Sequence, residues 1–314
     1  MVLFDPAPVR ARLARCPVHA TSPLLRGKVA GRPLWIKDER ARMGLGSFKA
    51  LGGAYAVLRH VEKRGPNMVF VTASAGNHGL SVAAGARVFG ARARVHIAAT
   101  VPEAFADRLR AEGTEVVRSG EAYEAAVAAA EADAEATGAI HLADGSWPGY
   151  TEPPRLVMEG YTVIAEELRE AFEADGAWPD TVYLQAGVGG LAAATAERIR
   201  AAWSDRPRIV VVEPEAAPCL KASVAAGRIV TVQGPVSAMG RLDCKTPSML
   251  ALDVLRKAAD DFVTVSEIEA AEAADLMACE GLPTTPSGAA GVAAWRQLGG
   301  ERPLVILSEG PTDA

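Results

Sequence analysis

Short apolar runs alternate with longer alanine-rich segments along most of this chain. A short apolar run that is rich in Val and Ile is typical of a strand buried on both faces. The alanine-rich segments between the runs have the length and composition of helices. We therefore predict strands at 33–37, 68–72, 94–98, 115–118, 181–185, 208–212 and 304–308. Helices are predicted at 80–89, 102–112, 122–137, 161–172 and 191–203.

This alternation predicts an α/β fold, because parallel strands are joined through crossover helices that cover both faces of a sheet. The predicted strands between residues 61 and 150 form one compact group, and the others form a second. A segment rich in Gly and Pro, 144–154, marks the crossing between them. We predict two domains, each an open, mainly parallel sheet covered by helices: a large domain of residues 1–60 and 151–314, and a small inserted α/β domain of residues 61–150. A cleft between two such domains is a common place for a ligand.

The composition is that of a soluble protein. Of the 314 residues, 49% are apolar and 23% are charged, and the formal net charge is −5. An acidic balance without a basic block argues against nucleic acid and against an anionic membrane as partners. The sequence has no apolar stretch long enough to span a bilayer. Its four cysteines form no CxxC pair, and its first residues do not have the pattern of a signal peptide. We therefore expect reduced thiols and a cytoplasmic location.

One lysine stands in an unusual setting. Lys49 follows the loop 44–48, directly after a predicted strand, and an Ala, Leu and Gly run follows it. We expect these apolar neighbours to lower the pKa of Lys49, and an unprotonated lysine amine can form a Schiff base with an aldehyde. A lysine that lies on the helix surface or caps the helix would have the same local sequence.

A second candidate loop is Thr72–Gly79, at the carboxyl end of a predicted strand, where open α/β sheets bind ligands. Small residues and Asn77 in this loop expose N–H groups and short polar side chains that suit a carboxylate or a phenolate oxygen. The alternative is a helix N-cap, in which Ser74 or Asn77 binds the free amides.

A third loop, Gln185–Leu191, again joins a strand to a helix and contains three glycines. Glycines let the backbone approach an anion closely, and a helix amino end attracts negative charge. The loop has neither the GK[ST] of a Walker A motif nor a full GxGxxG pattern. It suits a phosphate that needs no lysine, or it is a tight βα turn.

Together, the lysine and the two loops supply what is needed to hold pyridoxal phosphate. Here the chain resembles the fold-type II pyridoxal-phosphate enzymes, and in more detail the diaminopropionate ammonia-lyase family. Six segments carry the resemblance, in the order of the family: 37–39 with 44–55, 72–79, 144–160, 185–191, 239–248 and 308–313.

The resemblance implies a role for individual residues. Lys49 would form the Schiff base with pyridoxal phosphate and carry a proton, and Asn77 would bind the phenolate oxygen of the cofactor. The cofactor phosphate would be held by Gly187, Val188, Gly189, Gly190 and Leu191. Ser308 would bind the pyridine nitrogen, and Ser74, Ala75 and Gly76 would bind the substrate α-carboxylate. Asp144 would lie near the substrate, as a proton acceptor or as a partner of its β-ammonium group.

The sequence departs from the family at several positions. The lyases typically have an acid where Ala75 stands, an acid associated with the D-isomer, whereas serine and threonine dehydratases have alanine there. Asp243 and Lys245 replace the usual Asn and Gly, and Pro286 stands where many relatives have an acid. Glu309 follows Ser308 directly, which makes this segment one residue shorter than in the lyases.

From the resemblance we expect a carbon–nitrogen lyase of amino-acid catabolism. It would catalyse α,β-elimination on a small amino acid, with 2,3-diaminopropionate as the lead substrate and pyruvate and ammonia as products. The alternative is a serine/threonine or hydroxyaspartate dehydratase, favoured by Ala75. A β-replacing synthase and a non-catalytic module that binds nucleotide at 187–190 are further alternatives. The resemblance also implies a homodimer. No metal ligand is expected, since the histidines lack metal-binding spacing.

Overall fold

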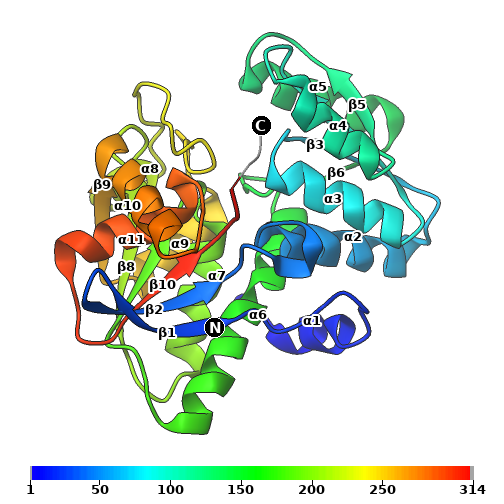
Figure 1. Cartoon of the computed structure of the whole chain (residues 1–314). Coiled ribbons are helices and arrows are strands. Elements are labelled where there is room, and N and C mark those ends of the chain that lie inside the picture. Colours follow the sequence, from blue (N-terminus) through cyan, green and yellow to red (C-terminus); the bar gives the residue numbers. More distant parts are fainter. Residues whose placement is uncertain (1, 312–314) are drawn as a thin grey trace.

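The computed structural model describes residues 2–311, and it contains two sheets (Figure 1). The larger sheet has the strand order β1-β2-β10-β7-β8-β9. Its strands run parallel except β1, which forms an antiparallel hairpin with β2 at one edge. The bounds are β1 Leu24–Val29, β2 Arg32–Asp38, β7 Thr181–Gln185, β8 Arg208–Pro214, β9 Asp261–Val265 and β10 Pro303–Leu307.

The smaller sheet is parallel throughout, with the order β5-β4-β3-β6. Its strands are β3 Val69–Ala73, β4 Arg92–Ile97, β5 Glu115–Arg118 and β6 Ile140–His141. The strands predicted between residues 61 and 150 therefore pair with one another, together with the two-residue strand β6, which the sequence did not indicate. The predicted α/β fold with mainly parallel sheets is confirmed. The domain bounds themselves stay a prediction.

Helices cover both faces of each sheet. Neighbouring residues of a strand point to opposite faces, so they pack against different helices. In β7, Val182 and Leu184 pack with α6, α7 and α9, whereas Tyr183 packs with α10 and α11 on the other face. In the smaller sheet, α3 and α4 cover one face and α5 covers the other. The helices are α1 Pro6–Leu13, α2 Lys49–Arg64, α3 Asn77–Val88, α4 Glu103–Ala111, α5 Tyr123–Thr137, α6 Glu152–Asp175, α7 Gly190–Ala202, α8 Cys219–Ala226, α9 Met249–Ala258, α10 Glu267–Cys279 and α11 Pro286–Leu298.

In Figure 1 the larger sheet lies on the left, and the smaller sheet lies on the right with α2 to α5. None of the helices within residues 2–311 combines the length and apolar character that crossing a bilayer requires.

The helix predicted at 161–172 is longer than expected, since α6 begins at Glu152. Pro153 and Pro154 lie in its first turn, where a missing N–H breaks no hydrogen bond, so they start the helix rather than interrupt it. The Gly- and Pro-rich crossing therefore ends at the start of α6 instead of continuing to Pro154.

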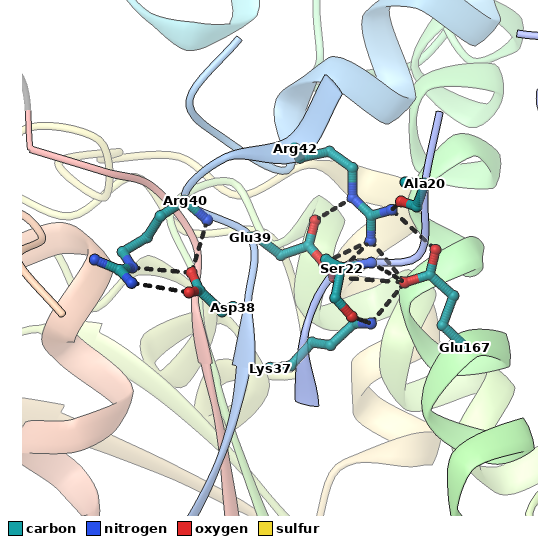
Figure 2. Close-up of polar contacts among 8 residues, drawn as sticks. All are labelled: Ala20, Ser22, Lys37, Asp38, Glu39, Arg40, Arg42 and Glu167. Atoms are coloured by element: carbon teal, nitrogen blue, oxygen red, sulfur yellow. Dashed lines mark hydrogen bonds and ion pairs between the residues drawn. The ribbon is translucent and has the colours of Figure 1, made fainter. Parts of the chain in front are cut away.

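A buried ionic network links β2 to α6 below the loop that leads to Lys49 (Figure 2). Arg42 donates to both carboxylate oxygens of Glu39 at 2.7 Å and to those of Glu167 at 2.9 and 2.7 Å. Lys37 donates to Glu167 at 2.6 Å and to the carbonyl of Ser22 at 2.8 Å. Two cations thus face two carboxylates, so burial leaves no net charge unpaired. The network holds the 39–42 turn, and through it the start of α2, against α6.

Helix α2 packs unusually closely against α6. A Cβ atom at Gly160 would lie 2.7 Å from the carbonyl oxygen of Leu51 and 2.8 Å from Cα of Gly52. Only a residue without a side chain permits this approach of the two backbones. The contact lies within one turn of Lys49, so α6 fixes where the helix that carries this lysine begins.

Candidate active site

Lys49 lies at the carboxyl end of β10, beside a residue from the far end of the sequence. The N–H of Phe48 donates to the carbonyl of Ser308 at 3.1 Å, and that of Gly310 donates to the carbonyl of Gly46 at 2.9 Å. Ser47 forms an isolated bridge with Glu309 between these two bonds. The backbone around residue 47 therefore runs alongside the segment after β10, which brings Lys49 and the buried Ser308 together.

The Nζ atom of Lys49 contacts a carboxylate oxygen of Asp144, which lies in the loop after β6. The two side chains are 20% and 25% exposed. Burial, the largest single influence, lowers the pKa of Lys49. The charge and hydrogen bond of Asp144, together with Tyr161 and Cys244, outweigh burial and raise this pKa above the ordinary lysine value. Burial, the largest single influence, raises the pKa of Asp144, but the Lys49 ammonium and His78 together outweigh burial and hold this pKa below the ordinary range. The expectation of a lowered lysine pKa is therefore wrong for this pair, because the sequence did not show that a carboxylate 95 positions later lies beside the amine.

The loop 74–76 leads into α3, which begins at Asn77, earlier than the predicted Leu80. The N-cap residue is Gly76, and no side chain caps the first amides of the helix. The N-cap alternative for this loop is therefore wrong: Ser74 accepts only from the N–H of Gly76, at 3.3 Å, and Asn77 donates its side-chain amide to Glu309. The amino end of α3 is left available to an anion.

The loop 187–189 likewise leads into a helix without a side-chain cap. Gly189 is the N-cap of α7 and has φ +99°, a value that favours glycine. A Cβ atom at Gly187 would lie 2.9 Å from Sγ of Cys244 and 3.1 Å from the carbonyl oxygen of Arg241. The carbonyl of Val188 accepts from the N–H of Ser248 at 3.0 Å. The glycines are thus needed for both the turn and its close packing against the segment 241–248.

The same segment connects this loop to Asp144. Ser248 accepts from the N–H of Ser146 at 3.1 Å, and the N–H of Met249 donates to the carbonyl of Ser146 at 2.9 Å. The lysine, the aspartate and the glycine loop therefore belong to one continuous set of contacts.

Sequence reasoning missed three side chains of this region. Tyr161 has a buried hydroxyl without a hydrogen-bond partner among residues 2–311, and its ring centroid lies 5.9 Å from Nζ of Lys49. Glu309 is 3% exposed and accepts from Asn77 and from the hydroxyl of Thr285. Arg241 lies 3.7 Å from the Glu309 carboxylate. Tyr161, Glu309 and Arg241 stand inside or directly beside segments that carry the family resemblance, which is the only sequence signal that pointed to them.

Two of the departures from the family have a local structural role. Lys245 donates to Asp243 at 2.6 Å and to the carbonyls of Ala216 and Pro235 at 2.9 and 2.7 Å. Lys245 therefore connects the segment 243–245 to the backbone at residues 216 and 235. Pro286 is in the first turn of α11, where proline favours the start of a helix.

A cavity of about 330 Å³ lies elsewhere, at the far end of α2 between α1 and α6. Its lining is highly charged, but Arg12 pairs with Glu62 at 2.7 Å and Arg155 with Glu159 at 3.0 Å. Neither Lys49 nor Asp144 lines this cavity, so it is not part of the lysine site. Within residues 2–311, no group of three or more His, Cys, Asp or Glu is placed to hold a metal ion.

The residues present fit pyridoxal phosphate. The uncapped, glycine-lined amino end of α7 offers N–H groups to a phosphate. The unpartnered hydroxyl of Tyr161 lies near Lys49 and offers a further donor. Asn77 contacts Glu309, the neighbour of Ser308, and the N–H of Phe48, the neighbour of Lys49, contacts the Ser308 carbonyl, so Lys49, Asn77 and Ser308 lie in one region. Residues 312 and 313 of the last matching segment lie outside the described residues.

Comparison with known proteins gives matches over nearly the whole chain. A family model described as "Pyridoxal-phosphate dependent enzyme" matches residues 16–310. Diaminopropionate ammonia-lyase of Escherichia coli strain K12 is 31% identical over 259 residues, which cover 76% of this chain and 65% of that enzyme. The chain therefore matches slightly less than two thirds of the length of this relative.

Solved structures show the same similarity. Diaminopropionate ammonia lyase from Escherichia coli in complex with D-serine superposes with a TM-score of 0.89 at 26% identity, covering 100% of this chain and 91% of that one. A threonine deaminase from T.th. gives a TM-score of 0.86 at 29% identity, with 99% of this chain and 98% of that one covered.

Proposed function

Because the chain belongs to the family of pyridoxal-phosphate dependent enzymes, we propose that it is an ammonia-lyase acting on a small amino acid. The lead substrate is 2,3-diaminopropionate, with pyruvate and ammonia as products. The similarity to diaminopropionate ammonia-lyase over 76% of the chain supports this substrate. The observation that carries the proposal is the contact between Lys49 and Asp144, together with the uncapped amino ends of α3 and α7 in the same region.

The proposal assigns each residue a place. Lys49 carries the cofactor, Asn77 binds its phenolate oxygen and Ser308 binds its pyridine nitrogen. The phosphate lies at the amino end of α7, on Gly187, Val188, Gly189, Gly190 and Leu191. The substrate α-carboxylate lies at the amino end of α3, on Ser74, Ala75 and Gly76. Asp144 faces both the lysine and the substrate.

Bound pyridoxal phosphate supplies an electron sink that stabilises negative charge on the substrate α-carbon. The protein supplies the proton transfers. As an ammonium, Lys49 has no free electron pair, so its proton must first leave, and Asp144 is the acceptor in contact with Nζ. Once Asp144 has taken that proton, the amine of Lys49 removes the α-proton. In the alternative, Lys49 keeps its proton and the carboxylate of Asp144 removes the α-proton. The same groups return a proton to the leaving β-substituent.

A serine/threonine or hydroxyaspartate dehydratase is the second candidate. Ala75 favours it, because this position offers no carboxylate to a D-isomer, and the similarity to the threonine deaminase supports it. The same residues would act in both reactions, and only the leaving group differs. Rates with each substrate, assayed separately, distinguish the candidates. Diaminopropionate and serine both yield pyruvate, whereas threonine yields 2-oxobutyrate and 3-hydroxyaspartate yields oxaloacetate.

The first test is the variant Lys49→Ala. We expect it to lose both the visible absorbance of the lysine-bound cofactor and pyruvate formation from L-2,3-diaminopropionate. Lys63→Ala, at the other end of α2 and 65% exposed at its side chain, is the matched control and should keep both. Turnover retained in Lys49→Ala would overturn the proposed site. D-diaminopropionate should be a poor substrate for the wild type, and equal rates with both isomers would contradict the role given to Ala75.

We also propose that the protein is a cytoplasmic homodimer of amino-acid catabolism. The free state of Cys16, Cys219, Cys244 and Cys279 supports a reducing compartment, and the family resemblance supports the dimer. Light scattering on the purified protein measures the oligomeric state directly.

A further inference from the structure

Arg241 lies directly against the loop that leads into α3. A Cβ atom at Gly76 would be 3.0 Å from Nη1 and 3.1 Å from Cζ of Arg241, so the guanidinium covers the face of this glycine. The backbone N–H of Arg241 donates to the hydroxyl of Ser287 at 3.1 Å, which fixes the base of the side chain on α11. Cζ also lies 5.8 Å from the ring centroid of Phe105. The guanidinium is therefore held at the loop from two sides.

The guanidinium has unused hydrogen-bonding capacity. Its one carboxylate neighbour within residues 2–311 is Glu309, and the distance from Nε to Oε2 is 3.7 Å. A charge-assisted hydrogen bond between such groups is about 2.7–2.9 Å long. Arg42, by contrast, makes such bonds to both Glu39 and Glu167. The Arg241 side chain is 33% exposed, so a ligand in solution can reach it.

Two attractive groups therefore face the same place. The amino end of α3 has no side-chain cap and presents partial positive charge beside Gly76. Arg241 adds a full positive charge directly beside the same glycine. Ala75 contributes no negative charge to the loop. A carboxylate between the helix end and the guanidinium would be bound from both sides, and the planar guanidinium favours carboxylates through paired donors.

We propose that Arg241 is a specificity-determining residue that binds a carboxylate of the amino-acid substrate against Gly76. The inference rests on the proposed function, because it places the substrate at this loop. It deepens that function by assigning a side chain, rather than backbone amides alone, to the recognition of substrate charge. The carboxylate is the α-carboxylate or a second one on the β-carbon, and the two sources are separable by experiment.

The test measures binding to the cofactor-loaded protein by calorimetry. Three probes share a β-hydroxyl group: L-serine, L-serinamide, which lacks the carboxylate, and 3-hydroxyaspartate, which carries a second one. Arg241→Met should weaken the binding of the recognised carboxylate about 10–100-fold, the range of a lost charged hydrogen bond. Arg87→Met, at the far end of α3 and 57% exposed, is the matched control and should bind all three probes like the wild type.

The probes identify the carboxylate. If Arg241 binds the α-carboxylate, Arg241→Met loses the preference for L-serine over L-serinamide. If it binds a second carboxylate, the variant loses only the preference for 3-hydroxyaspartate over L-serine. Unchanged preferences in a variant that still binds the probes would overturn the inference and leave the proposed function standing. A wild type that binds no amino acid would overturn the proposed function itself.

A second variant separates recognition from mere packing. Glu309→Gln removes the negative charge beside the guanidinium while keeping the size of the side chain. It should tighten carboxylate binding about 2–10-fold, opposite in sign to Arg241→Met, because it removes one negative charge that repels the bound carboxylate. Weaker binding in both variants would contradict the inference, since it would indicate a disturbed loop rather than a lost charge. Cofactor absorbance should be the same in the wild type and in Arg241→Met.

Discussion

Tyr161 places a buried polar group beside the lysine site. Its hydroxyl is buried without a hydrogen-bond partner within residues 2–311, and its ring packs edge-on against Phe48, the neighbour of Lys49, with centroids 4.8 Å apart. An unpaired buried polar group costs about 1–3 kcal/mol of stability. A ligand oxygen at the lysine site would satisfy this hydroxyl.

We therefore predict that Tyr161→Phe separates stability from activity. The variant removes only the unpaired oxygen, so its melting temperature should equal or exceed that of the wild type. Its elimination rate with L-2,3-diaminopropionate should fall about 10-fold, if the hydroxyl makes one hydrogen bond worth roughly 1.4 kcal/mol in the active complex. Thermal unfolding and a pyruvate assay measure both quantities. A less stable variant with normal turnover would show that the hydroxyl has a structural partner instead.

At the residue scale, the sequence predicted which loops to inspect, but not which side chains face one another. Lys49 and the loops 74–77 and 187–191 follow strands, and that local order is visible in the sequence. The partners that decide their chemistry come from elsewhere: Asp144 sets the charge of Lys49, and Glu309 binds Asn77. Such contacts arise only when the sheets have formed, so neither the lysine pKa nor the position of Arg241 followed from the local sequence.

At the scale of elements, the contact of α2 with α6 decides where Lys49 lies. Strands and helices with strong apolar patterns were predicted to within a few residues, as for β5 and α7. The β1–β2 hairpin was not, because its two-residue turn, Ala30–Gly31, has positive φ at both positions although only one is glycine. Helices α8 to α11 were not predicted either.

We predict that Gly160→Ala lowers the free energy of unfolding by about 1–3 kcal/mol, the usual range for overpacking. Alanine favours a helix more than glycine does, so any loss reflects the contact with Leu51 and Gly52 rather than propensity. Cofactor binding should weaken as well, because the start of α2 is displaced. Urea unfolding and absorbance titration measure the two effects. Gly27→Ala, where an added Cβ meets nothing within 4 Å, should be nearly neutral, and an equal loss in both variants would contradict the explanation.

At the scale of the whole molecule, acid should destabilise the fold partly through His141. Burial, with a smaller contribution from His78, lowers the pKa of His141 to about 4, from an ordinary value of 6.5. The folded state then binds fewer protons than the unfolded state between these two values. The contribution of His141 to the free energy of unfolding is therefore fully present above about pH 6.5, and it is lost as the pH falls toward 4.

The expected loss attributable to His141 is about 1–2 kcal/mol, less than the full shift because the ring is partly exposed. Urea unfolding at about pH 7.5 and about pH 5, on either side of the ordinary histidine pKa, measures it. His141→Gln should show a smaller difference between the two conditions than the wild type. An identical difference would mean that other groups account for the acid sensitivity.

The strand order of the larger sheet has a consequence for the growing chain. β10 lies between β2 and β7, yet it follows every other strand of that sheet in the sequence. A nascent chain therefore presents β1–β2 and β7–β9 as two separate pieces until residues 303–307 emerge. The smaller sheet, built from residues 69–141, is complete long before then. Between the synthesis of β7 and that of β10, two apolar strand edges are thus open to chaperones or to mispairing, and Ser308 reaches Lys49 only after β10 has emerged.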